Sequence, residues 1–381
     1  MTTRDATTLA FAGASLCAFA FVVGAAVASR ARRWGALFGY DFPGGPLRHR
    51  IGVPLAGGVA LWTATLATFA LAALTCLLAR PILPEVVVRY IDGMWSRANE
   101  VAAILGLATL VLIAGLTADL FDLGWKPRLA SQTMIAAALA VMGVRVTLFW
   151  PLTHPAIGGL VATLWIVGLI NAFAFLDNMD GLAAGIGLIA SLLFAATQAQ
   201  IGGLFAPAAL LVFAGALGGV LVYNRYPAPL FLGQGGSWLI GFVLAAMTIA
   251  GTYYRYGVEE SRNSVLSPLL VMAVPFYESA VVFLVWLGER RSPFLRNPRH
   301  FSYRLGEVGL SPAQSVRLLL LVSVGAGLGS LLLRRLDAFG TIVLLAQVGC
   351  LIAVVSLVEA SAIRRKRSVA ADDEVRPDRH E

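Results

Sequence analysis

The chain has 381 residues, of which 58% are hydrophobic and 13% are charged, and its mean hydropathy is +0.79. This composition excludes an ordinary soluble globular protein and indicates a membrane protein. The net charge of +8 comes mostly from basic residues that lie between apolar runs, so it indicates membrane topology rather than nucleic-acid binding.

Apolar runs long enough to cross a hydrocarbon core, about 17–25 residues each, recur along the chain. We expect eleven membrane-spanning helices, at residues 8–29, 53–79, 101–117, 132–150, 158–176, 181–199, 203–223, 237–254, 267–287, 315–333 and 339–361. Only helices and closed barrels satisfy the backbone polar groups in lipid, so the predicted fold class is an all-α polytopic membrane protein. The first run is too long for a signal peptide and is expected to be a retained helix.

Basic residues predict the orientation of these helices. They gather after the first, third, ninth and eleventh runs, at residues 30–50, 126–128, 290–304 and 364–367. By the positive-inside rule, we expect the N-terminus outside the cell and the C-terminus in the cytoplasm. We predict a single integral-membrane domain over residues 1–362, followed by a charged cytoplasmic tail over residues 363–381 that is expected to be disordered.

Unusual polar residues collect in the connections that are expected on the cytoplasmic side. These connections are residues 41–58, 115–132, 171–185, 223–237 and 289–305. Asp119 and Asp122 are three residues apart, as are Asp177 and Asp180, and on a helix each pair would share one face. The connection at 223–237 contains several glycines, which would let backbone amides approach an anion.

The residue types in these connections predict a metal-assisted site for a phosphorylated substrate, facing the cytoplasm. Carboxylates on separate loops can hold Mg²⁺, which prefers oxygen ligands and leaves positions for substrate phosphates. Glycine-rich turns and basic loops suit phosphate and pyrophosphate groups. The alternative is that the four aspartates are ordinary helix-end residues, because Asp is common near helix N-termini for capping and dipole reasons.

Five motifs resemble those of the polyprenyl-phosphate N-acetylhexosamine-1-phosphate transferases. NAFAFLDNMDGLAAG (171–185) is similar to the family's N-x-x-N-x-x-D-N-M-D-G-L, and LVYNRYPAPLFLGQGGS (221–237) is similar to Y-N-x-x-P-A-x-x-F-L-G-D-S-G-S. GLTADLFDL (115–123) resembles G-L-x-D-D-L-x-D-L, and VPFYES (274–279) resembles V-P-x-x-D-T. RSPFLRNPRHFSYRLGEVGLSP (291–312) resembles S-P-F-x-x-D-R-x-H-x-H-H-R-L-x-x-x-G-L-S-P.

This resemblance, which extends over residues 10–360, implies a helix bundle with its site in a cytoplasmic cleft of the bacterial inner membrane. The implied reaction moves a sugar 1-phosphate from a UDP-linked N-acetylhexosamine to undecaprenyl phosphate, with loss of UMP and help from Mg²⁺ or Mn²⁺. The implied process is cell-envelope polysaccharide synthesis. The expected partners are undecaprenyl phosphate, UDP-N-acetylhexosamine and membrane lipid; a homodimer is allowed, and no nucleic acid is expected.

The resemblance also implies roles for individual residues. The catalytic candidates are Asp119, Asp122, Asp177 and Asp180. The metal-ligand candidates are Asp119, Asp177, Asp180 and, as a weak ligand, Gln234. The substrate-binding candidates are His49, Arg128, Asn171, Asn224, Gly233, Gly236, Ser237, His300 and Arg304.

Several positions depart from the family pattern. The replacements are Ala118, Ala174 and Gln234 in the first motifs, Glu278 in the ninth run, and Ser302 and Tyr303 in the basic loop. Loss of a base at Ala118 need not abolish transfer, because the second pKa of a phosphate monoester is about 6. Gln234 keeps a carbonyl oxygen but lacks the negative charge on which a Mg²⁺ site depends.

Three functions therefore stay open from the sequence. The first is a transferase with a weakened metal site, and the second is a non-catalytic homologue that binds the lipid carrier or regulates an active paralogue. A secondary transporter is less favoured, because transporters commonly contain repeated halves, whereas this sequence shows no internal repeat and gathers its polar residues at one face.

Overall fold

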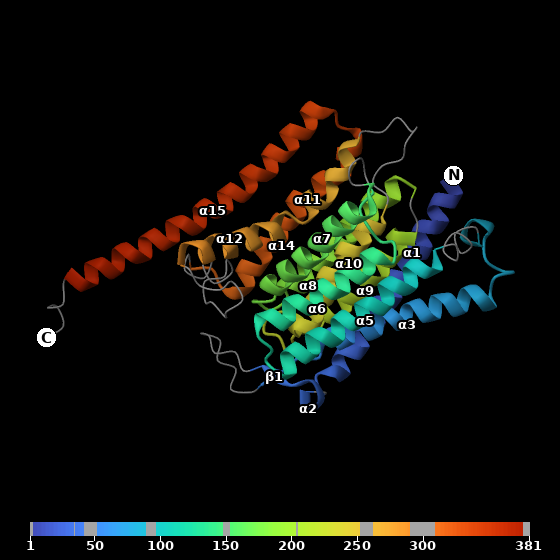
Figure 1. Ribbon diagram of the computed structural model, residues 1–381, viewed down its shortest axis with the longest axis horizontal. Coiled ribbons are helices and arrows are strands. Elements are labelled where there is room, and N and C mark those ends of the chain that lie inside the picture. The colour runs from blue at the N-terminus through green and yellow to red at the C-terminus, as the bar shows by residue number, and fades with distance from the viewer. Residues whose placement is uncertain are drawn as a thin grey trace.

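The computed structural model is a bundle of long helices (Figure 1). It describes residues 3–33, 35–41, 52–88, 97–147, 153–202, 205–251, 262–289 and 309–375. The α-helices are α1 (Thr3–Ala31), α2 (Gly35–Phe38), α3 (Gly57–Leu78), α5 (Ala98–Leu120), α6 (Trp125–Val141), α7 (Pro155–Leu176), α8 (Leu182–Gln200), α9 (Phe205–Asn224), α10 (Gly233–Ala250), α11 (Ser267–Val271), α12 (Ala273–Glu289), α14 (Pro312–Leu328) and α15 (Ala338–Val375). Short 3₁₀ turns are η1 (Arg262–Leu266), η2 (Gly329–Leu331) and η3 (Leu333–Arg335).

The apolar runs of the sequence become these long helices, so the predicted all-α membrane class is confirmed. Nine helices of the described chain are long and apolar enough to cross a membrane, or ten when a bent pair counts as one span. The expected span at 132–150 corresponds to α6, whose 17 residues are about 25 Å long at 1.5 Å per residue. The predicted count of eleven spans stays a prediction.

The bent pair interrupts the run expected at 267–287. Its limbs, Asn263–Val271 and Ala273–Leu284, meet at an angle of 61°. Pro275 lies just beyond the break and lacks the N–H that would donate to the carbonyl of Val271, and its ring crowds that carbonyl. A continuous apolar run therefore becomes two limbs that point in different directions.

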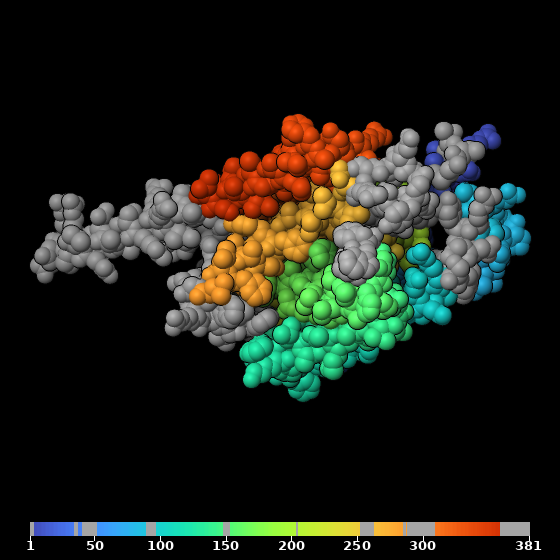
Figure 2. All heavy atoms as spheres, turned by 45° about the horizontal axis from the view of Figure 1, so that its top comes forward, coloured from blue at the N-terminus to red at the C-terminus, as the bar shows by residue number. Residues whose placement is uncertain are grey.

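The start of α1 and the end of α15 lie at opposite ends of the bundle (Figure 1). This arrangement agrees with an odd number of crossings, but which end faces the cytoplasm stays a prediction. α15 continues to Val375, past residue 363 where the charged tail was expected to begin, and the domain boundary also stays a prediction. Figure 2 shows α15, in red, along the edge of the molecule beside α12 and α14 in orange.

The core of the bundle surrounds α10. In the apolar window of α10, 83% of the residues are buried, against 17% for the window of α1 and 22% for that of α15. α10 packs against α3, α5, α7 and α8, and glycines allow the closest approaches. A Cβ on Gly115 of α5 would lie 2.5 Å from the Cα of Gly235, so these two backbones touch directly.

One end of the bundle gathers the polar connections. Here α5, α7 and α9 end, and α3, α8 and α10 begin; we call it the site end. Residues 225–232, the α9–α10 loop, are held there by backbone hydrogen bonds. Gly57 donates to Phe231 O at 2.8 Å, and the N–H of Phe231 donates to Pro54 O at 3.0 Å. Pro54 belongs to β2 (Val53–Pro54), which pairs antiparallel with β1 (Tyr40–Asp41). These hydrogen bonds join the α9–α10 loop to the segment that leads into α3.

Candidate functional site

Asp119, in the last turn of α5, binds the first turn of α10. Its Oδ2 accepts hydrogen bonds from the N–H of Gln234 at 2.8 Å and of Gly235 at 3.5 Å. The carboxylate thus neutralises the positive end of the α10 dipole and satisfies amides that have no partner within the helix. Gly233 has φ +68°, and a Cβ there would lie 2.7 Å from this oxygen. Glycine is therefore required for the contact.

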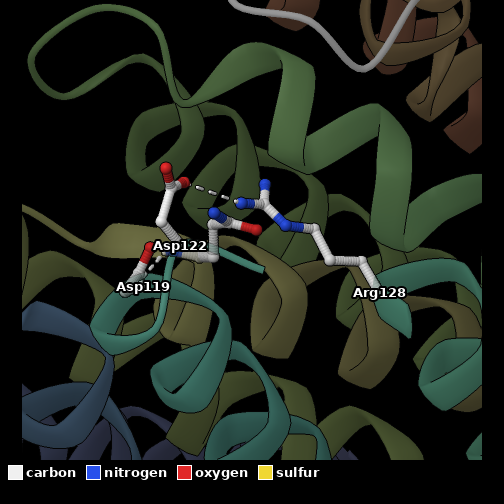
Figure 3. Close-up of polar contacts among 4 residues, drawn as sticks. Asp119, Asp122 and Arg128 are labelled. Atoms are coloured by element: carbon white, nitrogen blue, oxygen red, sulfur yellow. Dashed lines mark hydrogen bonds and ion pairs between the residues drawn. The ribbon is translucent and has the colours of Figure 1, made fainter. Parts of the chain in front are cut away.

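Asp122 faces solvent and pairs with Arg128 (Figure 3). It follows the end of α5, has φ +43° and is fully exposed, with a side-chain exposure of 103%. Its Oδ1 lies 3.5 Å from Nη2 of Arg128, whose side chain is 24% exposed. The Nε of Arg128 is buried and has no hydrogen-bond partner among the described residues. The expectation that Asp119 and Asp122 share a helix face is wrong, because Asp122 lies beyond the helix.

Asp177 and Asp180 lie in the turn between α7 and α8, which we call the carboxylate turn (residues 177–180). α7 ends at Leu176, and the N–H of Asp177 still donates to Phe173 O at 3.1 Å. Asp180 Oδ2 accepts the N–H of Ala228, in the α9–α10 loop, at 2.9 Å. The expectation that Asp177 and Asp180 share a helix face is also wrong, because α7 ends at Leu176, before either residue.

The aspartates are also not caps of the helices that come directly after them. α8 begins after Gly181, which has φ +81° and provides no side-chain cap. Asp119 caps α10, more than a hundred residues further along the chain, and Asp180 binds a loop rather than a helix terminus. Among the described contacts, Asp119 caps a helix through a long-range contact. Asp122 is an exposed residue directly after a helix end, as the helix-end alternative expects.

Two predicted substrate-binding asparagines make internal contacts. Asn171 Nδ2 donates to Gln132 Oε1 of α6 at 2.7 Å and to Val167 O at 2.8 Å. Asn224 is 3% exposed, and its Nδ2 donates to Leu230 O at 2.9 Å across the α9–α10 loop. These bonds join helices and brace the loop, while a role in binding substrate stays a prediction.

The glycine-rich turn has mainly a packing role in the structure. Its first amides, which the sequence suggested for a substrate anion, are bound by Asp119. A Cβ on Gly236 would lie 3.0 Å from the Cα of Gly58, and Ser237 Oγ donates to Gly233 O at 3.1 Å. Substrate binding by Gly233, Gly236 and Ser237 stays a prediction.

The remaining predicted positions are of two kinds. His49, His300 and Arg304, together with the replacements Ser302 and Tyr303, lie outside the described residues. Ala118 is buried in α5, while Ala174 and Gln234 are half-buried.

The carboxylates do not form a ready metal site in this arrangement. Their oxygen chemistry suits Mg²⁺, but no group of three or more His, Cys, Asp or Glu side chains in the described part of the chain is placed to hold a metal ion. Asp119 and Asp180 each commit an oxygen to a backbone N–H. Binding of Mg²⁺ by Asp119, Asp177, Asp180 and Gln234 stays a prediction, and we assign no chemical step to the ion.

The structure adds a residue that the sequence noted only as a replacement. Glu278, in α12, is 1% exposed, and its Oε1 lies 3.5 Å from Nδ2 of Asn178 in the carboxylate turn. A carboxylate inside an apolar run is the signal that identifies such a position, because ionisable residues at membrane depth are costly and commonly functional.

Comparison with known proteins places this geometry in a family. Residues 101–252 match the sequence profile of glycosyl transferase family 4. The probable undecaprenyl-phosphate N-acetylglucosaminyl 1-phosphate transferase of Bacillus subtilis is 27% identical over 251 residues, covering 64% of this chain and 68% of that protein. The decaprenyl-phosphate N-acetylglucosaminephosphotransferase of Mycolicibacterium smegmatis is 33% identical over 247 residues, covering 58% and 60%. Its namesake in Mycobacterium leprae is 30% identical over 301 residues, covering 72% and 71%.

The matched region contains both carboxylate-bearing turns, the α9–α10 loop and α10. The resemblance drawn from the motifs is therefore confirmed by sequence similarity that extends over 58–72% of the chain. The chain belongs to glycosyl transferase family 4, together with relatives named as polyprenyl-phosphate N-acetylglucosamine-1-phosphate transferases.

Proposed function

We propose that the chain transfers N-acetylhexosamine 1-phosphate from a UDP-sugar to undecaprenyl phosphate at the site end. The observation that carries the proposal is the convergence of two carboxylate-bearing turns on one segment. Asp119 binds the start of α10, and Asp180 binds the loop that leads into it. The names of the matched relatives supply the polyprenyl phosphate and the transferred N-acetylglucosamine 1-phosphate. The UDP-linked donor is what the motif resemblance implies.

In the proposed reaction, an oxygen of the lipid phosphate attacks the phosphorus that carries the sugar. The bond from that phosphorus to the bridging oxygen of the UDP group breaks, and UMP leaves with this oxygen. Much of the lipid phosphate is already a dianion at neutral pH, because its second pKa is about 6. The lipid phosphate therefore needs no base from the protein to act as a nucleophile. The alanine at position 118, where the family has an aspartate, is compatible with transfer.

Arg128 is the cation that we assign to a substrate phosphate. Its only described ion pair is to the fully exposed Asp122, and an exposed pair of this kind is weak and screened by salt. A phosphate can displace Asp122 and accept two parallel hydrogen bonds from the guanidinium. Asp122 would then keep the Arg128 side chain near its binding position when no substrate is present.

The proposed location is the inner membrane of a bacterium, with the site end facing the cytoplasm. Arg32, which directly follows α1, lies at this end: its guanidinium is 4.9 Å from the ring centre of Tyr223, in the last turn of α9. Lys126 and Arg128 open α6 at the same end. The positive-inside rule assigns such an end to the cytoplasm.

A non-catalytic homologue is the second candidate, and one observation favours it. In the described structure, the carboxylate of Asp119 is committed to the amides of Gln234 and Gly235, and Gln234 itself stands where the family has an acidic ligand. A chain with these features could keep the lipid-binding surface and lose turnover.

The test is transfer in membranes that contain the chain, undecaprenyl phosphate, a labelled UDP-N-acetylhexosamine and Mg²⁺. We expect labelled lipid pyrophosphate and an equal amount of UMP. The Asp177→Ala variant should lose this product. Asp337→Asn is the matched control, because Asp337 caps α15 through the N–H of Gly340, away from both carboxylate-bearing turns.

The outcomes separate the two candidates. If none of the UDP-N-acetylhexosamines tested gives labelled product, in an assay where a Bacillus relative is active, the transferase proposal is overturned. Retained binding of undecaprenyl phosphate by that inactive chain would then support the non-catalytic homologue. Restored product in Gln234→Asp or Ala118→Asp would identify the replacement that removed turnover.

A further inference from the structure

Glu278 is a buried carboxylate that the proposed reaction does not use. It lies in α12, is 1% exposed, and faces the amide of Asn178, whose Nδ2 is 3.5 Å from Glu278 Oε1. The same Nδ2 donates to Phe175 O, near the end of α7, at 2.8 Å. Both amide protons of Asn178 therefore have acceptors, one on α7 and one on α12.

Asn178 lies between the two carboxylates of the carboxylate turn, Asp177 and Asp180. Its side chain thus links that turn to a helix a hundred residues further along the chain. A second contact supports the same packing: the rings of Trp165 on α7 and Phe276 on α12 meet edge to face, 5.5 Å apart. The first half of α12 is therefore seated against α7.

α12 depends on such side contacts for its direction. It is the second limb of the bent pair and leaves α11 at 61°, so backbone hydrogen bonds of a continuous helix do not align it. Further along the limb, Phe283, Leu284 and Leu287 are exposed. The described contacts of α12 with α7 and the carboxylate turn are therefore made by its first half, at Phe276 and Glu278.

The position of α12 matters because its contact is with the carboxylate turn itself. Asn178, which faces Glu278, stands between Asp177 and Asp180, both predicted catalytic residues. A change in the contact between α12 and Asn178 would therefore alter the placement of these two carboxylates.

We propose that Glu278 is a positioning residue that fixes α12 against the carboxylate turn, and that this contact sets the affinity for the UDP-sugar. The structural half of the proposal, the Glu278–Asn178 link, stands on the geometry alone. The affinity half rests on the proposed function. The acceptor oxygen is what matters, so an amide at this position should serve and an apolar side chain should not.

A distance measurement tests the link without any need for activity. In full-length protein with Cys17, Cys76 and Cys350 replaced by serine, spin labels are placed at the exposed positions Leu284 on α12 and Leu164 on α7. We expect a narrow distribution of label-to-label distances in the reference protein. Glu278→Met should broaden or shift it.

Matched variants separate loss of the contact from loss of the fold. Glu278→Gln keeps an acceptor oxygen at the same reach and should preserve the narrow distribution. Ser279→Ala is the control on the same helix, because Ser279 Oγ donates only to Pro275 O of its own turn. If Glu278→Met does not fold, Glu278→Asp, whose oxygens stop one methylene short, should give the shift. An unchanged distribution in the folded variant would overturn the proposal.

Kinetics test the affinity half. In the transfer assay, we expect the KM for the UDP-sugar to rise about tenfold in Glu278→Met, as for loss of one hydrogen bond to a charged group, and to stay unchanged in Glu278→Gln. A lower kcat with unchanged KM would mean that Glu278 only supports the fold, and would overturn this half. If the reference protein shows no transfer, the proposed function fails, whereas the spin-label result still decides the structural link.

Discussion

The two carboxylate-bearing turns share one spacing but are held in different ways. At the end of α5, Asp119 is still within the helix and reaches two amides of α10. At the end of α7, both carboxylates lie beyond the helix, and Asp180 reaches one amide of the α9–α10 loop. Aspartates at the same spacing therefore occupy a helix end in one case and an irregular turn in the other.

The two turns also differ in how they contact neighbouring helices: one through the backbone and the other through side chains. Behind Asp119, the backbones of α5 and α10 touch at Gly115 and Gly235, which leaves no room for adjustment. The carboxylate turn is connected to its neighbours by side chains, through Asp180 to Ala228 and through Asn178 to Glu278. The α5 turn is therefore a rigid reference, and the carboxylate turn is the adjustable partner.

The largest expected effect comes from opening the contact between α5 and α10. Gly115→Ala places a Cβ 2.5 Å from the Cα and 2.6 Å from the N of Gly235. Backbone atoms cannot move aside like a side chain, so we expect a loss of about 3 kcal/mol or more in the free energy of unfolding. Unfolding of the purified protein in mixed micelles, followed by circular dichroism, measures the change.

The matched control is Gly106→Ala on the same helix. No described atom lies within 4 Å of a Cβ at Gly106, so this variant should be neutral or up to about 1 kcal/mol more stable, as expected from helix propensity. Equal destabilisation by the two variants would contradict the rigid contact.

The next effect concerns Asp119. Asp119→Ala removes the acceptor from the amides of Gln234 and Gly235, and we expect a loss of about 2 kcal/mol in the free energy of unfolding, as for hydrogen bonds to a charged group. Asp119→Asn keeps an oxygen and should lose less. Faster amide exchange at Gln234 in the alanine variant would locate the effect at the start of α10, and unchanged exchange there would count against the cap.

Asp180→Ala should be milder, because the described contact of Asp180 is with a loop N–H, whereas Asp119 binds amides at the positive end of a helix dipole. We expect a loss of about 1 kcal/mol, with faster amide exchange at Ala228 and an unaltered start of α10. The same unfolding experiment decides the order of the two variants. A larger loss for Asp180→Ala than for Asp119→Ala would reverse the assignment of the rigid and the adjustable turn.

Helix positions were largely predictable from the sequence, and the misses have local causes. The run at 158–176 matches α7, which ends at Leu176. α6 was expected at residue 132 but begins at Trp125, because its first turn contains Lys126 and Arg128 and resembles a loop. The bend between α11 and α12 is invisible in an apolar run, since hydropathy does not register the missing N–H of Pro275.

The site was predictable as a set of residues but not as a set of contacts. Motif resemblance brought Asp119 and the glycine-rich turn into one site, and the structure places them in contact. The motif resemblance could not show that the Asp119 carboxylate itself binds the amides of Gln234 and Gly235, because this contact depends on how closely α5 approaches α10. Nor could it identify the Glu278–Asn178 link, which joins segments a hundred residues apart.

The smallest expected effect is at Asp122. This residue has the same place in its pair as Asp180 has in the other, but it is fully exposed and makes a 3.5 Å ion pair with Arg128. Asp122→Ala should lower the unfolding midpoint only slightly, because alanine tolerates φ +43° less well than aspartate. The small loss should be the same at low and at high salt, because exposed pairs contribute little and salt screens them. Asp122→Val should lower the midpoint, since a β-branched residue is strained at φ +43°. A salt-dependent loss in the alanine variant as large as that of Asp180→Ala would mean that the ion pair, rather than the packing of α5 on α10, holds this turn.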